Sequence, residues 1–80
     1  MKDRFLATIE IRILRIFDKR GIATFEIIRD IFILVPDEHL SEVIRALIMS
    51  GFLRQEGPYI SRTDSGKAVL MENEIEGELR

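Results

Sequence analysis

The sequence predicts one small α+β domain over residues 1–80, mainly helical with a single β-hairpin. Apolar residues recur at helical spacing in four stretches. Two short runs, 52–55 and 59–62, are separated by Glu56-Gly57-Pro58, a tripeptide that favours a tight turn. The chain is 46% apolar and 32% charged, which is typical of a globular protein, and 80 residues can enclose one modest core.

The first helix is expected over residues 3–19 and is expected to end at Gly21. Residues 8–13 alternate and would also suit a strand, but the helical pattern is longer. Arg12, Arg15 and Lys19 gather on the side of the helix away from its apolar face. Ile11 and Leu14 form a second apolar strip, which is either extra core or a subunit contact. The apolar face itself is predicted to hold Phe5, Leu6, Ile9, Ile13, Ile16 and Phe17.

The second and third helices are expected over residues 25–34 and 37–50. Thr24 is placed to cap the second helix and Asp37 the third, and Pro36 separates them. Just before the second helix, residues 22–23 are suited to a short strand that pairs with the hairpin. Gly51 is expected to end the third helix, whose apolar stripe consists of Leu40, Val43, Ile44, Leu47 and Ile48.

The closing helix is expected over residues 64–79, after a cap at Thr63. Its apolar residues step by three or four positions and make a narrow seam of the coiled-coil kind. This helix is therefore a candidate dimerisation element. Together with the second strip of the first helix, the predicted dimer interface consists of Ile11, Leu14, Met71, Ile75 and Leu79.

Composition argues against several classes of function. Without cysteine and with one histidine, the chain offers no thiolate metal site, no cysteine nucleophile and no histidine pair, so we expect no enzyme, no metal and no cofactor. No apolar run approaches a membrane span, and the start MKDRF is unlike a signal peptide, so we expect a cytoplasmic protein. Scarce amide side chains, only Gln55 and Asn73, fit a thermophile.

The order of these elements resembles a winged helix-turn-helix domain of the kind found in small archaeal and bacterial transcription regulators. The resemblance covers most of the chain and is most specific from Leu40 to Leu70. In that family a glycine and two apolar residues follow the third helix, here Gly51, Phe52 and Leu53. The returning strand often ends in aromatic, aliphatic, x, x, Thr, x, x, Gly, which matches Tyr59-Ile60-Ser61-Arg62-Thr63-Asp64-Ser65-Gly66.

The resemblance implies binding of double-stranded DNA by a homodimer. The helix over 37–50 would enter the major groove, and the short wing over 54–62 would contact the backbone or the minor groove. The DNA contacts expected on this basis are Ser41, Glu42, Arg45, Arg54, Arg62 and Lys67.

The charges of the same face favour a second hypothesis. The chain has a net charge of −2, and Asp37, Glu38 and Glu42 place acids on the outward side of the third helix, with Arg45 as the cation there. Residues 72–78 add four glutamates. Acidic surfaces repel phosphate and suit a basic protein partner. A winged-helix module or adaptor that binds protein and not DNA is therefore the alternative.

Overall fold

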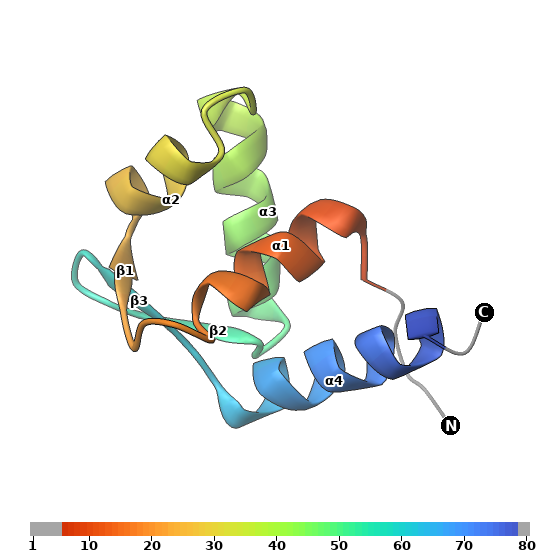
Figure 1. Ribbon diagram of the computed structural model, residues 1–80. Coiled ribbons are helices and arrows are strands. Elements are labelled where there is room, and N and C mark those ends of the chain that lie inside the picture. The colour runs from red at the N-terminus through yellow and green to blue at the C-terminus, as the bar shows by residue number, and fades with distance from the viewer. Residues whose placement is uncertain (1–5, 79–80) are drawn as a thin grey trace.

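The computed structural model describes the backbone of residues 6–78 and the side chains of residues 6–73. The described chain contains four helices and one three-stranded antiparallel sheet, so the α+β class is confirmed (Figure 1). In chain order the elements are α1 (Thr8–Ile16), β1 (Ala23–Thr24), α2 (Phe25–Ile31), α3 (Asp37–Met49), β2 (Leu53–Glu56), β3 (Tyr59–Arg62) and α4 (Asp64–Glu78).

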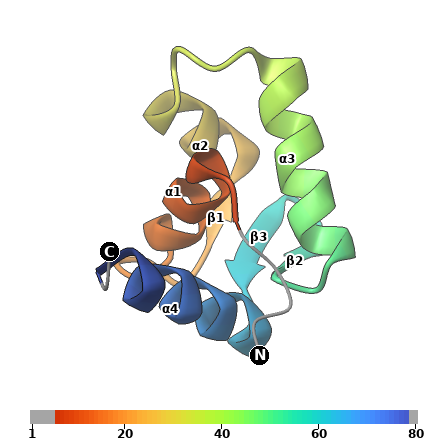
Figure 2. The same ribbon diagram turned by 90° about the vertical axis from the view of Figure 1, so that its right-hand side faces the viewer.

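One core joins all of the helices to the sheet. Figure 1 shows α3 behind α1, and in both Figures 1 and 2 α4 runs below the two helices. Each element contributes apolar side chains to the space between them, and together these provide the burial that stabilises a domain of this size. The largest fully buried side chains are Ile13, Leu14, Ile28, Leu40, Leu47, Leu53, Ile60 and Leu70.

The first helix is shorter than its apolar pattern predicts. It begins at Thr8, where the carboxylate of Glu10 accepts the Ala7 N–H at 2.9 Å, and it ends at Ile16. The chain then tightens into turns, in which the Asp18 N–H bonds the Arg15 carbonyl and the Lys19 N–H bonds that of Ile16. The prediction that Gly21 ends this helix is therefore wrong. Residues 3–5 of the predicted helix lie outside the described residues.

The second helix is also shorter than predicted. Its cap is confirmed, because Thr24 Oγ1 accepts the Ile27 N–H at 3.3 Å, but the helix ends at Ile31 and not at residue 34. Phe32 leaves helical geometry with φ −105° and ψ 52°. Phe32 and Val35 pack partly against the core, whereas Ile33 and Leu34 between them are left exposed.

The third helix begins one residue earlier than the predicted cap at Asp37 implies. Pro36 is the N-cap residue and makes no side-chain cap bond, so Asp37 is the first helical residue and not the cap. The end at Gly51 is confirmed, because Gly51 has φ 82° and the Phe52 N–H reaches back to the Leu47 carbonyl at 2.9 Å. This is the Schellman arrangement, in which a positive φ favours glycine.

The hairpin and its third strand follow the prediction closely. The strands β2 and β3 pair antiparallel from Leu53–Arg62 to Glu56–Tyr59, with Gly57 and Pro58 as the two-residue loop. The short strand before α2 is confirmed with a shift of one residue, and it pairs Ala23 with Ile60. The strand order β1-β3-β2 places β3 in the centre.

Two contacts fix α4 against the rest of the domain. Asn73 accepts the Leu6 N–H at 2.9 Å through its side-chain oxygen, which joins α4 to the chain just before α1. At the other end, Thr63 Oγ1 accepts the Gly66 N–H at 3.0 Å, so the predicted cap at Thr63 is confirmed. A Cβ on Gly66 would lie 2.1 Å from the Phe52 carbonyl oxygen, so only glycine permits this approach.

Candidate nucleic-acid interface

The outer face of α3 is exposed and borders a shallow groove. Three of the predicted DNA contacts lie there: Arg45 and Glu42 are exposed and Ser41 is half-buried. Arg45 makes no ion pair with any of the described residues. The groove is nevertheless acidic, because its lining also includes Asp37 and Glu38, against the one cation Arg45.

A second groove lies between α3 and the hairpin and has a volume of about 330 Å³. Ser41 and Arg45 line it from α3, and Gln55 and Ile60 line it from β2 and β3. The structure therefore brings the predicted helix and hairpin together on one side of the domain. Gln55 is a hydrogen-bonding side chain in this groove that was not among the predicted contacts.

The exposed cation of the hairpin is Arg54. Its side chain is 67% exposed and its guanidinium lies 2.9 Å from the carboxylate of Glu56 on the same strand. Such an exposed pair contributes little to stability and is screened by salt, so Arg54 can exchange Glu56 for another anion. Lys67 is exposed near the start of α4, but neither of the two grooves that contain Arg45 includes Lys67 or Arg54.

Arg62 does not belong to this surface. Its side chain is only 11% exposed, and Nη1 donates to the carboxylate of Asp18 at 2.7 Å and to the Leu14 carbonyl at 3.0 Å. Arg62 therefore joins β3 to the end of α1. This geometry does not support the prediction that Arg62 contacts DNA, because its charge is already paired with Asp18 and its side chain is mostly buried.

The predicted dimer residues separate into different environments. Leu14 is fully buried in the core of a single chain, so it cannot contact a partner, and its assignment to a dimer interface is wrong. Ile11 is half-buried and packs against that core. Met71 is 52% exposed and remains available. The side chain of Ile75 and the whole of Leu79 lie outside the described residues.

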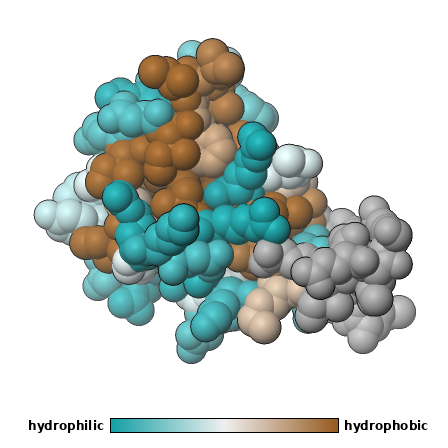
Figure 3. All heavy atoms as spheres, in the orientation of Figure 1, coloured by the Kyte–Doolittle hydropathy of each residue, from teal (hydrophilic) through white to brown (hydrophobic). Residues whose placement is uncertain are grey.

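Two surface features were not predicted as sites. An apolar cluster of Ile31, Ile33 and Leu34 lies at the end of α2, and Ile33 and Leu34 are 78% and 94% exposed. Figure 3 shows hydrophobic residues gathered over this end of the domain. The signal in the sequence is the run from Ile31 to Val35, which holds more apolar residues than one helical face can bury.

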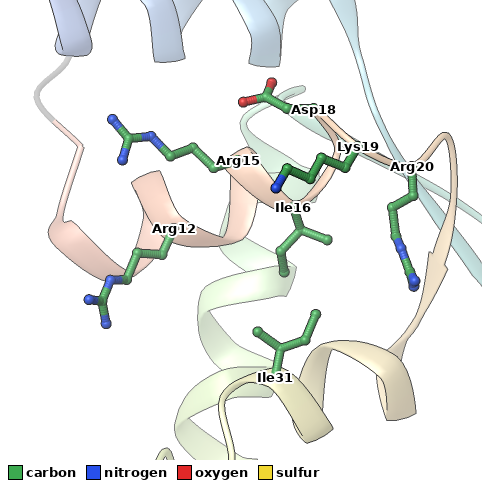
Figure 4. Close-up of a pocket in the computed structure, with 7 residues that line it drawn as sticks. All are labelled: Arg12, Arg15, Ile16, Asp18, Lys19, Arg20 and Ile31. Atoms are coloured by element: carbon green, nitrogen blue, oxygen red, sulfur yellow. The ribbon is translucent and has the colours of Figure 1, made fainter.

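The second feature is a basic groove on the outer side of α1. Arg12, Arg15, Lys19 and Arg20 line it, with Asp18 as its one acid (Figure 4). The sequence signal is the gathering of Arg12, Arg15 and Lys19 on one side of the first helix. We name this surface the α1 groove.

Other kinds of site find little support in the part of the chain that the structure describes. No group of three or more histidine, aspartate or glutamate side chains is arranged there to hold a metal ion. None of the helices described has the length and hydropathy that a membrane crossing requires. No family model, no curated protein and no solved structure matches this chain, so a function has to be inferred from the residues and the geometry above.

Proposed function

We propose that this chain is a winged-helix domain that binds double-stranded DNA and acts as a homodimeric transcription regulator. One observation carries the proposal: α3 and the hairpin β2–β3 border a common groove, with Arg45 and Ser41 on the helix and Gln55 on the strand. In a winged helix the third helix and the hairpin are the two elements that meet DNA. The order of helices and strands along this chain supports the same assignment.

The proposed docking places α3 in the major groove, which is wide enough to admit an α-helix. Arg45 is the residue suited to a bidentate contact with guanine, and Ser41 is suited to a hydrogen bond with a base or a phosphate. Glu42 can accept a hydrogen bond from cytosine. Arg54 on the hairpin would exchange Glu56 for a phosphate oxygen and so fix the position of the helix.

The acids near the start of α3 set the strength of this binding. Asp37, Glu38 and Glu42 line the groove beside the single cation Arg45, and Asp37 also lies 3.9 Å from the guanidinium of Arg29. Without Arg62, the cations proposed to contact DNA are Arg45, Arg54 and Lys67. With so few phosphate contacts, binding should be weak at physiological salt and strongest near 50 mM salt.

A dimer would let two copies of α3 address half-sites about one helical turn apart. The side chain of Met71 on α4 is exposed, which supports a dimer contact through this helix. The apolar seam predicted over residues 64–79 would extend that contact. We expect light scattering to give twice the chain mass for the wild type and the single mass for Met71→Glu.

The test of DNA binding uses two variants that break the same ion pair. Arg54→Ala removes a phosphate contact and should weaken binding to any duplex, lowering the magnitude of the salt slope by about 0.9. Glu56→Gln leaves Arg54 free and removes an acid, so it should strengthen binding. Fluorescence anisotropy with a labelled 30-base-pair duplex measures both. Because each variant loses the Arg54–Glu56 pair, equal effects of the two would mean a loss of structure and would contradict the proposal.

A second function is favoured by the apolar cluster at Ile31, Ile33 and Leu34. Large apolar side chains exposed to this degree suit a protein partner with an apolar surface. In that case the wild type would bind no duplex at 50 mM salt. It would retain a defined partner after nuclease treatment, and Ile33→Ser with Leu34→Ser would release that partner.

A further inference from the structure

The highest concentration of positive charge among the described residues lies on α1 and the turn that follows it, and not on α3. The α1 groove has a volume of about 530 Å³ and is lined by Arg12, Arg15, Lys19 and Arg20. Figure 4 shows their side chains around Ile16 and Ile31. The groove beside α3 has the opposite balance, with three acids and one cation.

The charges of the α1 groove are largely available to a ligand. Its one acid, Asp18, already holds the guanidinium of Arg62 at 2.7 Å. Arg12, Lys19 and Arg20 form no ion pair with any residue that the structure describes. A group of cations left without counter-charges is expected to gather anions from solution.

Capping of α1 does not explain these cations. Basic side chains near the end of a helix often interact with its free carbonyl groups. Here the Leu14 carbonyl accepts from Arg62 at 3.0 Å, and the carbonyls of Arg15 and Ile16 accept the N–H groups of Asp18 and Lys19. The end of the helix is thus satisfied by other donors.

The cations are spread along the α1 groove. Arg12 lies in α1, and Lys19 and Arg20 follow the end of the helix at Ile16, so the groove offers several separate positions for phosphate groups. Ile16 and Ile31 form the floor of the groove, and such apolar surface supports the aliphatic stems of arginine and lysine.

The α1 groove and the exposed face of α3 lie on opposite sides of the domain. Figure 1 shows α1 in front and α3 behind it, and in Figure 2, turned by 90°, α1 lies to the left and α3 to the right. One straight duplex cannot contact both surfaces at once. A ligand in the α1 groove is therefore additional to the DNA proposed for α3.

We propose that the α1 groove binds the phosphate backbone of a second nucleic-acid segment, so that one domain can hold two segments together. The inference shares with the proposed function the idea that the ligand is nucleic acid, but it depends on different residues. Recognition would be independent of base sequence, because the groove offers charges for phosphate and apolar surface for the stems.

The experiment combines two pairs of substitutions that remove equal charge. Arg12→Ala with Lys19→Ala alters the α1 groove, and Arg45→Ala with Arg54→Ala alters the α3 side. Each pair, the four substitutions together and the wild type are titrated with a labelled 30-base-pair duplex between 50 and 200 mM salt. All four altered side chains are exposed, and circular dichroism checks that each variant is folded.

The Arg45/Arg54 variant isolates binding through the α1 groove. It should still bind duplex, and adding Arg12→Ala with Lys19→Ala should reduce its salt slope by about 1.8, which is about 0.9 for each phosphate contact. Over this fourfold range of salt, the variant with all four substitutions would therefore lose about twelvefold less affinity than the Arg45/Arg54 variant does. If the α1 substitutions leave affinity and slope unchanged in both backgrounds, the inference is overturned.

Two further outcomes separate the inference from the proposed function. If the Arg45/Arg54 variant binds like the wild type while the Arg12/Lys19 variant does not, the α3 proposal fails and the α1 groove stands. If Arg12→Ala with Lys19→Ala halves the mass in light scattering and leaves DNA binding intact, the groove holds an acidic surface of a second copy. That result would also overturn the inference.

Discussion

Replacing Arg62 by alanine should unfold the domain more easily without removing a DNA contact. The substitution removes two hydrogen bonds, one to the Leu14 carbonyl at 3.0 Å and one to Asp18 at 2.7 Å. A bond from a charged donor to a carbonyl contributes about 1.5 kcal/mol. The Asp18 pair contributes less than about 1 kcal/mol, because the Asp18 side chain is 53% exposed and water screens the pair.

Loss of the Arg62 stem adds to this cost. The Arg62 Cγ would lie 3.0 Å from a Cβ placed on Gly66, so the stem packs at the start of α4. Burial of two of its methylenes contributes about 1 kcal/mol after allowance for partial exposure. The sum is about 3 kcal/mol. For a domain of this size that corresponds to a melting temperature lower by roughly 15 °C.

Arg54→Ala is the matched control, because it truncates the same side chain on the same hairpin. Arg54 is 67% exposed, so its loss should change the unfolding free energy by less than about 1 kcal/mol. Differential scanning calorimetry measures both variants, and anisotropy compares their DNA affinity. If Arg62→Ala melts within about 3 °C of the wild type and loses DNA affinity as Arg54→Ala does, then Arg62 contacts phosphate and the structural reasoning is refuted.

Two other pairs of substitutions test the packing. Gly66→Ala should destabilise by about 1–3 kcal/mol in chemical denaturation, although alanine normally favours a helix, because its Cβ would meet the Phe52 carbonyl oxygen. A Cβ added at Gly21 would have no atom within 4 Å, so Gly21→Ala should be neutral or slightly stabilising. Equal changes in stability for the two glycine substitutions would contradict this view. Leu14→Ala should cost about 2–5 kcal/mol, whereas Met71→Ala should cost less than about 1 kcal/mol; the reverse order would place Leu14 at an interface.

Local patterns predicted the elements that depend on local chemistry. The caps at Thr24 and Thr63 and the end of α3 at Gly51 each depend on a few neighbouring residues, so the sequence is sufficient to place them. The end of α1 involves a distant contact. Arg62, from the last strand, binds the end of α1, and no pattern within residues 3–19 could indicate that.

The candidate site was predicted less well than the fold, for a related reason. Arg54 and Arg62 look equivalent in the sequence, as two arginines flanking one hairpin. The pairing of β3 between β1 and β2 brings Arg62 next to Asp18, whereas Arg54 on the edge strand faces solvent. Which arginine remains available for a ligand is therefore decided by the topology of the sheet.

The basic side of the first helix illustrates the opposite case. Arg12, Arg15 and Lys19 could be placed on one face from helical spacing alone. Helical spacing does not indicate that Asp18 pairs with Arg62. It also does not indicate that the turn after α1 brings Arg20 beside these three cations. The net charge of −2 concealed this local excess of cations, because the acids lie elsewhere on the chain.

The central claim is that α3 and the hairpin form a surface that binds duplex DNA. The most direct test is an NMR titration of the ¹⁵N-labelled chain with a 15-base-pair duplex at about 50 mM salt, where nonspecific affinity is high. We expect the amide signals of Ser41, Arg45 and Arg54 to shift together with added duplex. Absence of any shift along α3 and β2 under these conditions would contradict the claim.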